Sequence, residues 1–167
     1  MDENILLREM KPDDWAGVAA VYKEGIATGN ATFQQEVPTW ESWDSSHVAS
    51  CRIVAEVEGQ VAGWAALTPV SGRCVYAGVA EVSVYVADRY RGRKIGARLL
   101  AKLIEESERE GFWTLQAGIF PENKASVKLH ENLGFRVVGY RERIGKMNGI
   151  WWDNLVLERR SATVGID

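Results

Sequence analysis

YRGRKIGARLL, residues 90–100, places four basic side chains and two glycines directly before a leucine-rich segment. An alternating strand pattern precedes it at 82–86, so the chain is predicted to leave a strand, turn and begin a helix. Such a turn points several free backbone N–H groups at one place, next to the positive end of the helix dipole. A solvated turn is the alternative, but basic residues oppose the dipole at a helix N-terminus. The stretch favours an anion site, with charge from Arg91, Arg93, Lys94 and Arg98.

Strand and helix signals alternate on both sides of this turn. A glycine-containing gap at 58–60 predicts a hairpin, and Asn148-Gly149 predicts a second one. The regular β-α alternation of a dinucleotide-binding sheet is missing. The pattern indicates an α/β (α+β) domain with a mostly antiparallel sheet. Its expected strands are residues 5–10, 52–57, 61–67, 78–87, 113–120 and two strands within 136–160.

Four helices are expected between these strands. The first begins at Pro12–Asp14 and runs to about Gly29. Thr39 caps a second helix that contains Trp43 and Val48, and the polar, aromatic segment 29–40 before it reads as a loop facing a pocket. The third helix follows the basic turn and ends at Gly111. The fourth lies within 121–135.

Bulk composition narrows the class of protein. The 167 residues suffice for one domain with a buried core, and a formal net charge of −3 gives no support to general nucleic-acid binding. The acidic start lacks the features of a signal peptide, and no apolar run predicts a membrane span. Two cysteines and two separated histidines form neither a disulfide framework nor a zinc motif. We expect a single cytosolic, metal-free domain over residues 1–167, with no nucleic-acid or membrane partner.

The segment VSVYVADRYRGRKIGARLL (82–100) resembles the acetyl-CoA-binding segment of the GCN5-related N-acetyltransferases (GNAT), whose signature is Q/R-x-x-G-x-G/A. Arg91 and Gly96 match it, whereas Lys94 replaces the first signature glycine and tolerates positive φ less well. NATFQQEVPTW (30–40), AEVSVYV (80–86) and NKASVKLHENLGF (123–135) are similar to the phosphinothricin acetyltransferase branch. FWTLQAGIFPEN and WWDNLVLERRS resemble its members assigned to arsinothricin resistance.

The resemblance implies a GNAT fold, with a sheet of about six to seven strands and CoA bound between splayed parallel strands at 82–86 and 113–120. It implies backbone contacts from Val84 and Val86, flanking Tyr85, to the pantetheine arm and acetyl group. Asn123 and Ser126 would meet the far end of the arm. The pyrophosphate would lie on Arg91, Gly92, Arg93, Lys94, Ile95, Gly96 and Ala97. A homodimer is usual in the resembling group.

Acetyl transfer to an amine requires loss of the amine proton and a proton for the departing thiolate. The resemblance makes Glu81 the candidate base; binding the substrate ammonium or pairing with a neighbour are its alternatives. His130 stands where many of these enzymes carry an acidic tyrosine, although a lone helical histidine is more often a packed residue. Tyr85 is the other candidate acid.

For the acceptor, Arg73 precedes the central strand, and a guanidinium suits a carboxylate, phosphinate or arsinate. A surface arginine is equally compatible with its loop. Thr32, Phe33 and Tyr76 are candidate pocket walls. Of Trp151 and Trp152, alternation sends one to the core and leaves the other for the site or a dimer contact.

The side chains that remain are given structural interpretations. Lys146 and Asp153 are expected to form a solvated pair. Cys51 and Cys74 are expected to be buried, inert thiols, since neither has a histidine partner in sequence.

The sequence thus predicts an acetyl-CoA-dependent N-acetyltransferase acting on the α-amine of a small amino acid with a polar tetrahedral group. Phosphinothricin, methionine sulfoximine and arsinothricin are the type substrates, and resistance is the implied role. Two alternatives stay open. One is transfer to a protein N-terminus or a polyamine, and the other is a CoA-binding module without catalysis.

Overall fold

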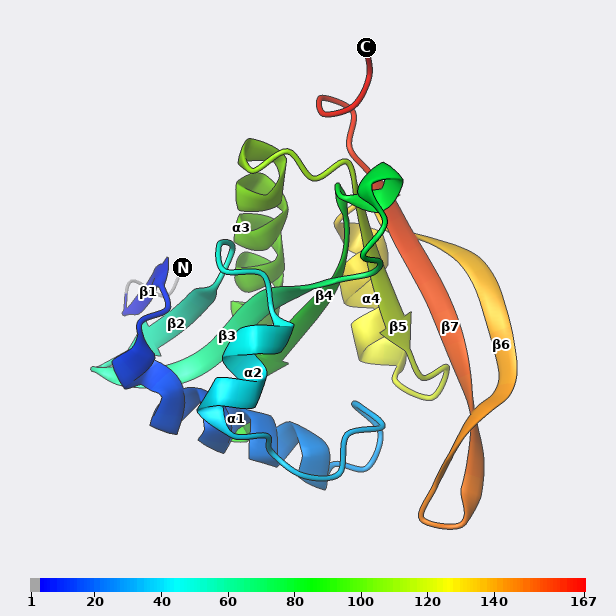
Figure 1. Cartoon of the computed structure of the whole chain (residues 1–167). Coiled ribbons are helices and arrows are strands. Elements are labelled where there is room, and N and C mark those ends of the chain that lie inside the picture. Colours follow the sequence, from blue (N-terminus) through cyan, green and yellow to red (C-terminus); the bar gives the residue numbers. More distant parts are fainter. Residues whose placement is uncertain (1–3) are drawn as a thin grey trace.

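The computed structural model describes residues 4–167 as a seven-stranded mixed sheet flanked by four α-helices (Figure 1). The strand order is β1-β2-β3-β4-β5-β7-β6, and every pair is antiparallel except β4–β5. The strands are β1 (Ile5–Glu9), β2 (Ile53–Val57), β3 (Gln60–Pro69), β4 (Val79–Val86), β5 (Thr114–Ile119), β6 (Arg136–Met147) and β7 (Ile150–Arg160). The helices are α1 (Trp15–Ala27), α2 (Trp40–Ser46), α3 (Ile95–Arg109) and α4 (Lys124–Asn132).

The parallel strands β4 and β5 separate part of the way along their length. They are paired only from Val79↔Thr114 to Glu81↔Gln116. Beyond that point β4 stays paired with β3 as far as Val86, whereas the edge facing β5 has no strand partner. The predicted mixed sheet with a splayed parallel pair is therefore confirmed, and the splay opens a space at the centre of the sheet.

Each face of the sheet is covered by its own layer of helices. On β3, Ala65 and Leu67 face the cluster that contains α3, while Trp64 and Ala66 face the cluster that contains α1 and α2. This alternation follows from the period of two along a strand. In α3 the predicted leucine stripe is buried, with Leu99 and Leu103 fully enclosed. Truncating either one would cost about 2–5 kcal/mol of stability.

The cap of the second helix agrees with the sequence, but the helix is shorter than expected. The first α-helix begins at Trp15, after a short 3-10 turn at Pro12–Asp14. Thr39 Oγ1 accepts a hydrogen bond from the Ser42 N–H and so caps α2. The helix ends at Ser46 because His47 turns to an extended conformation (ψ 151°). Val48 therefore lies outside the helix, and its N–H donates to the Leu67 carbonyl of β3. The expectation that the helix contains Val48 was wrong.

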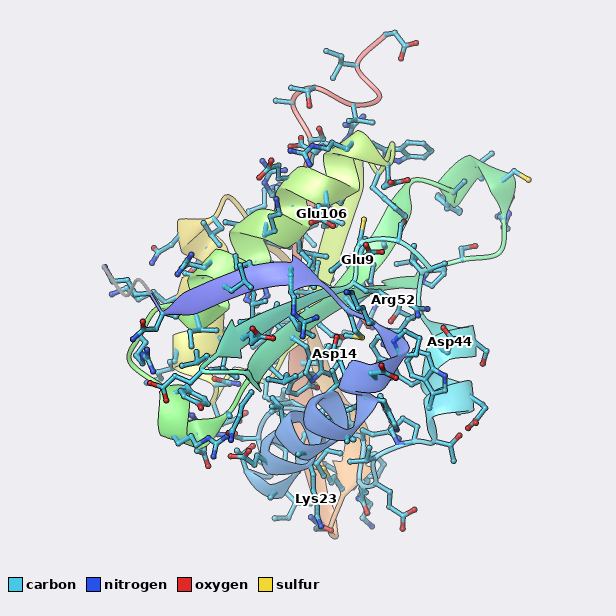
Figure 2. The ribbon with its side chains drawn as sticks, turned by 90° about the vertical axis from the view of Figure 1, so that its left-hand side faces the viewer. Glu9, Asp14, Lys23, Asp44, Arg52 and Glu106 are labelled. Carbon is cyan, nitrogen blue, oxygen red and sulfur yellow. The ribbon has the colours of Figure 1, made fainter. Side chains whose placement is uncertain are left out.

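Arg52 holds the segment after α2 in place. Its Nη1 lies 2.6 Å from Asp44 Oδ1 on α2. Figure 2, seen from the side of β1, labels both residues. The Nε of Arg52 donates to the Val48 carbonyl at 2.8 Å. One guanidinium therefore ties α2 to the chain that enters β2.

Both predicted hairpin turns are present. Asn148 (φ 53°) and Gly149 (φ 77°) form the tight turn between β6 and β7, where two successive positive φ angles favour Asn-Gly. The hairpin extends beyond the rest of the sheet (Figure 1). Along it the pairing register shifts between Arg141 and Gly145. Within residues 4–167, no helix has the length and apolar character needed to cross a bilayer.

Candidate active site

The space opened by the splayed strands forms a cavity of about 350 Å³. Its walls come from several parts of the chain. They are residues 31–34 of the loop after α1, residues 81–85 of β4, residues 117–120 at the end of β5, and Asn123, Ser126 and His130 of α4. Asn154 of β7 completes the lining. All three predicted catalytic residues, Glu81, Tyr85 and His130, therefore meet in one place with the predicted acceptor residues Thr32 and Phe33.

Glu81 stands where the two strands begin to separate. It is the last β4 residue in register with β5, opposite Gln116, and it is half-buried. Within residues 4–167, no hydrogen bond or ion pair engages its carboxylate. A half-buried carboxylate without a partner is costly unless a ligand or water uses it. Glu81 is thus placed to accept a hydrogen bond or a proton from a molecule in the cavity.

Tyr85, four residues after Glu81 on β4, also lines the cavity. Its ring packs against Trp64 (5.0 Å between centroids) and Tyr22 (4.9 Å), and Gly25 of α1 leaves room for it. Burial is the main cause that raises the pKa of the Tyr85 phenol well above its ordinary value. The hydroxyl therefore stays protonated at neutral pH and can donate a hydrogen bond or a proton.

His130 is buried on α4 and also lines the cavity. Its Nδ1 lies 2.7 Å from the Ser126 carbonyl, which can only accept, so Nδ1 carries a proton. Burial lowers the pKa of His130 below 6.5, so Nε2 has no proton at neutral pH. In this state the ring accepts a proton rather than donates one. Of the two predicted acids, the geometry therefore favours Tyr85.

The loop after α1 is fixed over the cavity by aromatic and polar contacts. Phe33 packs edge-to-face on Phe120 at 4.7 Å, and a Cβ at Gly145 of β6 would lie only 2.7 Å from its ring. Asn123 Nδ2 lies 3.5 Å from the Asn30 carbonyl. Asn123 Oδ1 accepts from the Ser126 N–H and caps α4. The loop predicted to face a pocket therefore does so, with Thr32 and Phe33 in its wall.

The basic turn follows directly from the splayed end of β4. Lys94, the residue before α3, has φ 61° and ψ 23°, so it takes the left-handed conformation for which the family signature uses glycine. No side chain caps the helix, and the N–H groups of Ile95, Gly96 and Ala97 are left without intrahelical partners. A Cβ at Gly96 would lie 3.5 Å from Leu129 of α4. The turn thus offers N–H donors without intrahelical partners beside the helix that borders the cavity.

The basic side chains of the turn have neighbours of their own. Arg91 Nε lies 2.9 Å from Asp88 Oδ1, and the Arg93 guanidinium lies 5.6 Å from the Tyr90 ring centroid. Gly92 has φ 81°, a conformation that favours glycine. The side chain of Val86, at the end of β4, lies beside the start of α3. A Cβ added to Gly96 would be 3.7 Å from it.

Two predicted acceptor residues lie elsewhere in the single chain. Arg73 and Tyr76 are on the exposed β3–β4 connection, where the guanidinium lies 5.7 Å from the tyrosine ring centroid. Neither lines the cavity. Because both residues lie on a loop, the position of their side chains could not be predicted from the sequence.

Several other expectations meet a mixed outcome. Trp152 packs on Phe120 behind the cavity, whereas Trp151 is exposed beneath Lys146. Asp153 accepts hydrogen bonds from the Tyr140 hydroxyl and the Arg143 N–H, so Lys146 and Asp153 have different partners rather than each other. Cys51 is buried as expected. Cys74 is exposed, because the β3–β4 connection lies on the surface, and the expectation of a buried thiol was wrong there.

Asn154 and Gly118 line the cavity without having been singled out from the sequence. Asn154 is next to Asp153 in a strand rich in polar and aromatic residues, so its pattern did not set it apart. Gly118, inside a strand, was a signal for a close approach of another group. Among the described residues, no cluster of three His, Cys, Asp or Glu side chains has metal-binding geometry.

Comparisons with known proteins agree with this architecture. The model of the acetyltransferase (GNAT) family matches residues 18–135. The phosphinothricin N-acetyltransferase of Streptomyces viridochromogenes is 34% identical over 88% of this chain and 82% of its own length. The L-methionine sulfoximine/L-methionine sulfone acetyltransferase of Pseudomonas aeruginosa is 28% identical over 88% of this chain and 89% of its own.

Solved structures show the same fold. A phosphinothricin acetyltransferase from Sinorhizobium meliloti in complex with AcCoA superposes with a TM-score of 0.85 at 25% identity, covering 98% of this chain and 97% of that one. A ribosomal-protein-alanine N-acetyltransferase from Brucella melitensis gives 0.86 at 32% identity, with 93% and 99% covered. The family match, the splayed strands and the uncapped helix after the basic turn agree. The chain belongs to the GNAT family of acetyltransferases.

Proposed function

We propose that this chain transfers the acetyl group of acetyl-CoA to the α-amine of a small amino acid that bears a polar tetrahedral group. The observation that carries the proposal is the unpartnered Glu81 carboxylate in a small cavity, next to a turn of exposed backbone N–H groups. The relatives named for phosphinothricin and methionine sulfoximine support this acceptor class.

Acetyl-CoA suits the groups that the protein leaves without partners. The N–H groups at the start of α3 and the left-handed Lys94 support pyrophosphate binding at 91–97. The unpaired β4 edge at Val84 and Val86 supports main-chain contacts to the pantetheine arm. Asn123 and Ser126, at the start of α4, border the same cavity. Acetyl-CoA supplies an activated acyl group when bound.

The proposed chemistry is direct attack of the amine on the thioester within a ternary complex. Glu81 removes the amine proton, directly or through a water. The Tyr85 phenol, which burial keeps protonated at neutral pH, supplies the proton for the thiolate. The unprotonated Nε2 of His130 suits a hydrogen-bond acceptor or proton relay on the wall opposite β4.

The cavity supports a small acceptor rather than a long one. Its volume of about 350 Å³ lies at the low end for ligand pockets. The loop over it is pinned to α4 and β6 by Asn123 and Phe33. The ribosomal-protein acetyltransferase likeness favours a second candidate, transfer to a protein N-terminus. Arg73 does not line the cavity, so its proposed role in binding the acceptor would need a contribution from outside the single chain.

A homodimer is proposed on the exposed face of the β6–β7 hairpin. Large apolar side chains are exposed there and on the β3–β4 connection, an arrangement typical of an interface. They are Val75, Tyr76, Val137, Val138, Tyr140, Ile144, Ile150 and Trp151. Sedimentation of the wild type and of Ile150→Lys tests this surface: a dimer that the substitution dissociates supports it, and a wild-type monomer removes it. A cytosolic location remains part of the same proposal.

The test of function is thiol release from acetyl-CoA in the presence of defined amines. Phosphinothricin, methionine sulfoximine and arsinothricin are compared with ordinary amino acids, a peptide with N-terminal alanine, and spermidine. We expect turnover with the tetrahedral amino acids. Turnover only with the peptide would replace the acceptor class by the second candidate, and turnover only with spermidine would indicate a polyamine enzyme. No release with any amine would favour a binding module.

A further inference from the structure

Gly118 forms an open point in the cavity wall. Its neighbours Ala117 and Ile119 are buried, while Gly118 itself is exposed to the cavity. A Cβ at this position would lie 3.0 Å from Asn154 Nδ2 and 3.6 Å from Glu81 Oε1. Side chains from β4 and β7 therefore converge over one residue of β5, and the glycine leaves the space between them open.

The two converging side chains have complementary chemistry. Glu81 offers only acceptor oxygens when ionised, whereas the Asn154 amide offers an NH₂ donor as well as an oxygen. Within residues 4–167, neither side chain hydrogen-bonds to another protein group. Asn154 is half-buried on a sheet strand, where an unpaired amide has no role in holding the fold. Both groups are thus free for a ligand in the cavity.

We infer that Asn154 positions the acceptor by donating a hydrogen bond to its α-carboxylate, while Glu81 faces the amine on the same carbon. This inference rests on the proposed function, since it names the part of the acceptor that this wall recognises. An α-amino acid carries its amine and its carboxylate on one carbon atom. A donor and an acceptor side chain that meet over an open glycine fit such a pair of charges.

The opposite orientation fits less well. An ammonium beside Asn154 would have a single neutral oxygen to contact, whereas Glu81 offers it a full negative charge. A carboxylate beside Glu81 would meet like charge. The arrangement therefore fixes the order of the two groups, and it selects acceptors that keep a free α-carboxylate.

The inference is tested with Asn154→Asp and two acceptors, phosphinothricin and its α-carboxamide. The new carboxylate repels the acceptor carboxylate and removes the donor. We expect kcat/KM for phosphinothricin to fall at least about tenfold, as for the loss of a hydrogen bond to a charged group. The value for the carboxamide should change less than about threefold, and KM for acetyl-CoA should not change. Equal losses with both acceptors, or no loss with either, would overturn the inference.

Two further variants exclude a general disturbance. Asn132→Asp makes the same chemical change on the exposed end of α4, outside the cavity, and should alter neither acceptor. Gly118→Ala places a methyl group between the two side chains and should lower kcat/KM for both acceptors. Full activity of Gly118→Ala would contradict the placement of the acceptor over this glycine.

Binding keeps this test separate from the proposed function. Isothermal titration of the wild type and Asn154→Asp with phosphinothricin, and then with the carboxamide, needs no turnover. A selective loss of phosphinothricin affinity supports the Asn154 contact even if thiol release shows another physiological acceptor. Unchanged affinity for phosphinothricin overturns it even if the enzyme acetylates that amino acid.

Discussion

Strand β4 connects two regions that would offer a ligand different kinds of binding group. Its middle, from Glu81 to Tyr85, lines the cavity, and its end runs into the basic turn before α3. In the turn the groups available to a ligand are backbone N–H groups oriented by the helix. In the cavity they are side chains brought together from β4, β7 and α4.

This difference predicts how each region responds to substitution. Backbone donors survive a change of side chain, provided that the conformation is kept and no negative charge is added. A cavity side chain acts alone, because no neighbour duplicates its chemistry. Single substitutions should therefore act strongly in the cavity and weakly in the turn.

The largest expected effect is that of Glu81→Gln. The amide keeps the shape of the side chain but cannot take the amine proton, so we expect kcat to fall at least about 100-fold. KM for acetyl-CoA should stay within about twofold in steady-state assays of thiol release. Glu122→Gln, an exposed residue outside the cavity, is the matched control. Wild-type kcat for Glu81→Gln across the pH range would remove the base assignment.

Tyr85→Phe should come next. Phenylalanine keeps the ring contacts with Trp64 and Tyr22 but has no proton to give, so kcat should fall about tenfold or more. Rapid-quench measurement of the chemical step checks this expectation. Tyr22→Phe removes a phenol of the same aromatic cluster that does not line the cavity and should leave kcat unchanged. Equal rates for the two variants would assign the proton to another group.

Gly96→Asp separates stability from binding in the basic turn. A carboxylate in the first turn of α3 interacts favourably with the helix dipole, but it would lie beside the apolar side chains of Leu129 and Val86, so the free energy of unfolding should change by less than about 1 kcal/mol. The same charge repels a pyrophosphate, so KM for acetyl-CoA should rise about tenfold. Urea denaturation and initial rates measure the two effects, with Gly96→Ser as the uncharged control. An unchanged KM would place the pyrophosphate elsewhere.

Lys94→Gly tests how much the turn depends on its side chains. Left-handed φ costs a lysine about 1 kcal/mol, which glycine relieves, so the variant should be more stable by up to that amount. KM for acetyl-CoA should change less than about threefold, because the N–H group keeps its place. Lys94→Ala loses the charge and keeps the strain, so it should gain no stability. A tenfold rise in KM for both variants would show that the ammonium carries the binding.

The smallest effect concerns His130 and pH. Burial lowers its pKa in the folded protein, so the unfolded chain takes up this proton first as the pH falls below about 6.5. The stabilising contribution is present above that pH and is lost as the pH falls towards the lower folded value. His130→Gln should therefore show a shallower loss of unfolding free energy between pH 7.5 and 5 in urea titrations. Burial also lowers the pKa of His47. The slope of unfolding free energy against pH in His47→Gln can therefore be compared with the slope in His130→Gln. An unchanged slope for His130→Gln would contradict the neutral buried ring.

Local features of the fold were predictable from the sequence because they depend on near neighbours. The alternation around Val82–Val86, the leucine stripe of α3 and the Asn148-Gly149 turn are set by periods of two, by helical spacing and by positive φ. The end of α2 was not predictable, because Val48 is drawn out of the helix by Leu67, a residue on another strand.

The candidate site shows the same division between features set by near neighbours and features set by distant residues. Glu81, Tyr85 and His130 were identified because they lie on segments that resemble a known family, and the structure brings them to one cavity. Asn154 was missed because its importance arises only where β7 passes Gly118. Arg73 was placed near the acceptor on its chemistry and on the resemblance, whereas in the structure it lies on the exposed β3–β4 connection and does not line the cavity.

By itself, the sequence determined the elements, their order, the basic turn before α3 and the family to which the chain belongs. Those features depend on backbone sterics, residue periodicity and helix capping, which act over a few residues. Only the tertiary structure decided which side chains share the cavity, that Lys94 adopts the glycine conformation, and that His130 presents an unprotonated nitrogen. Those features depend on strand splay, on burial and on contacts between elements that are distant in sequence, such as β4 and β7.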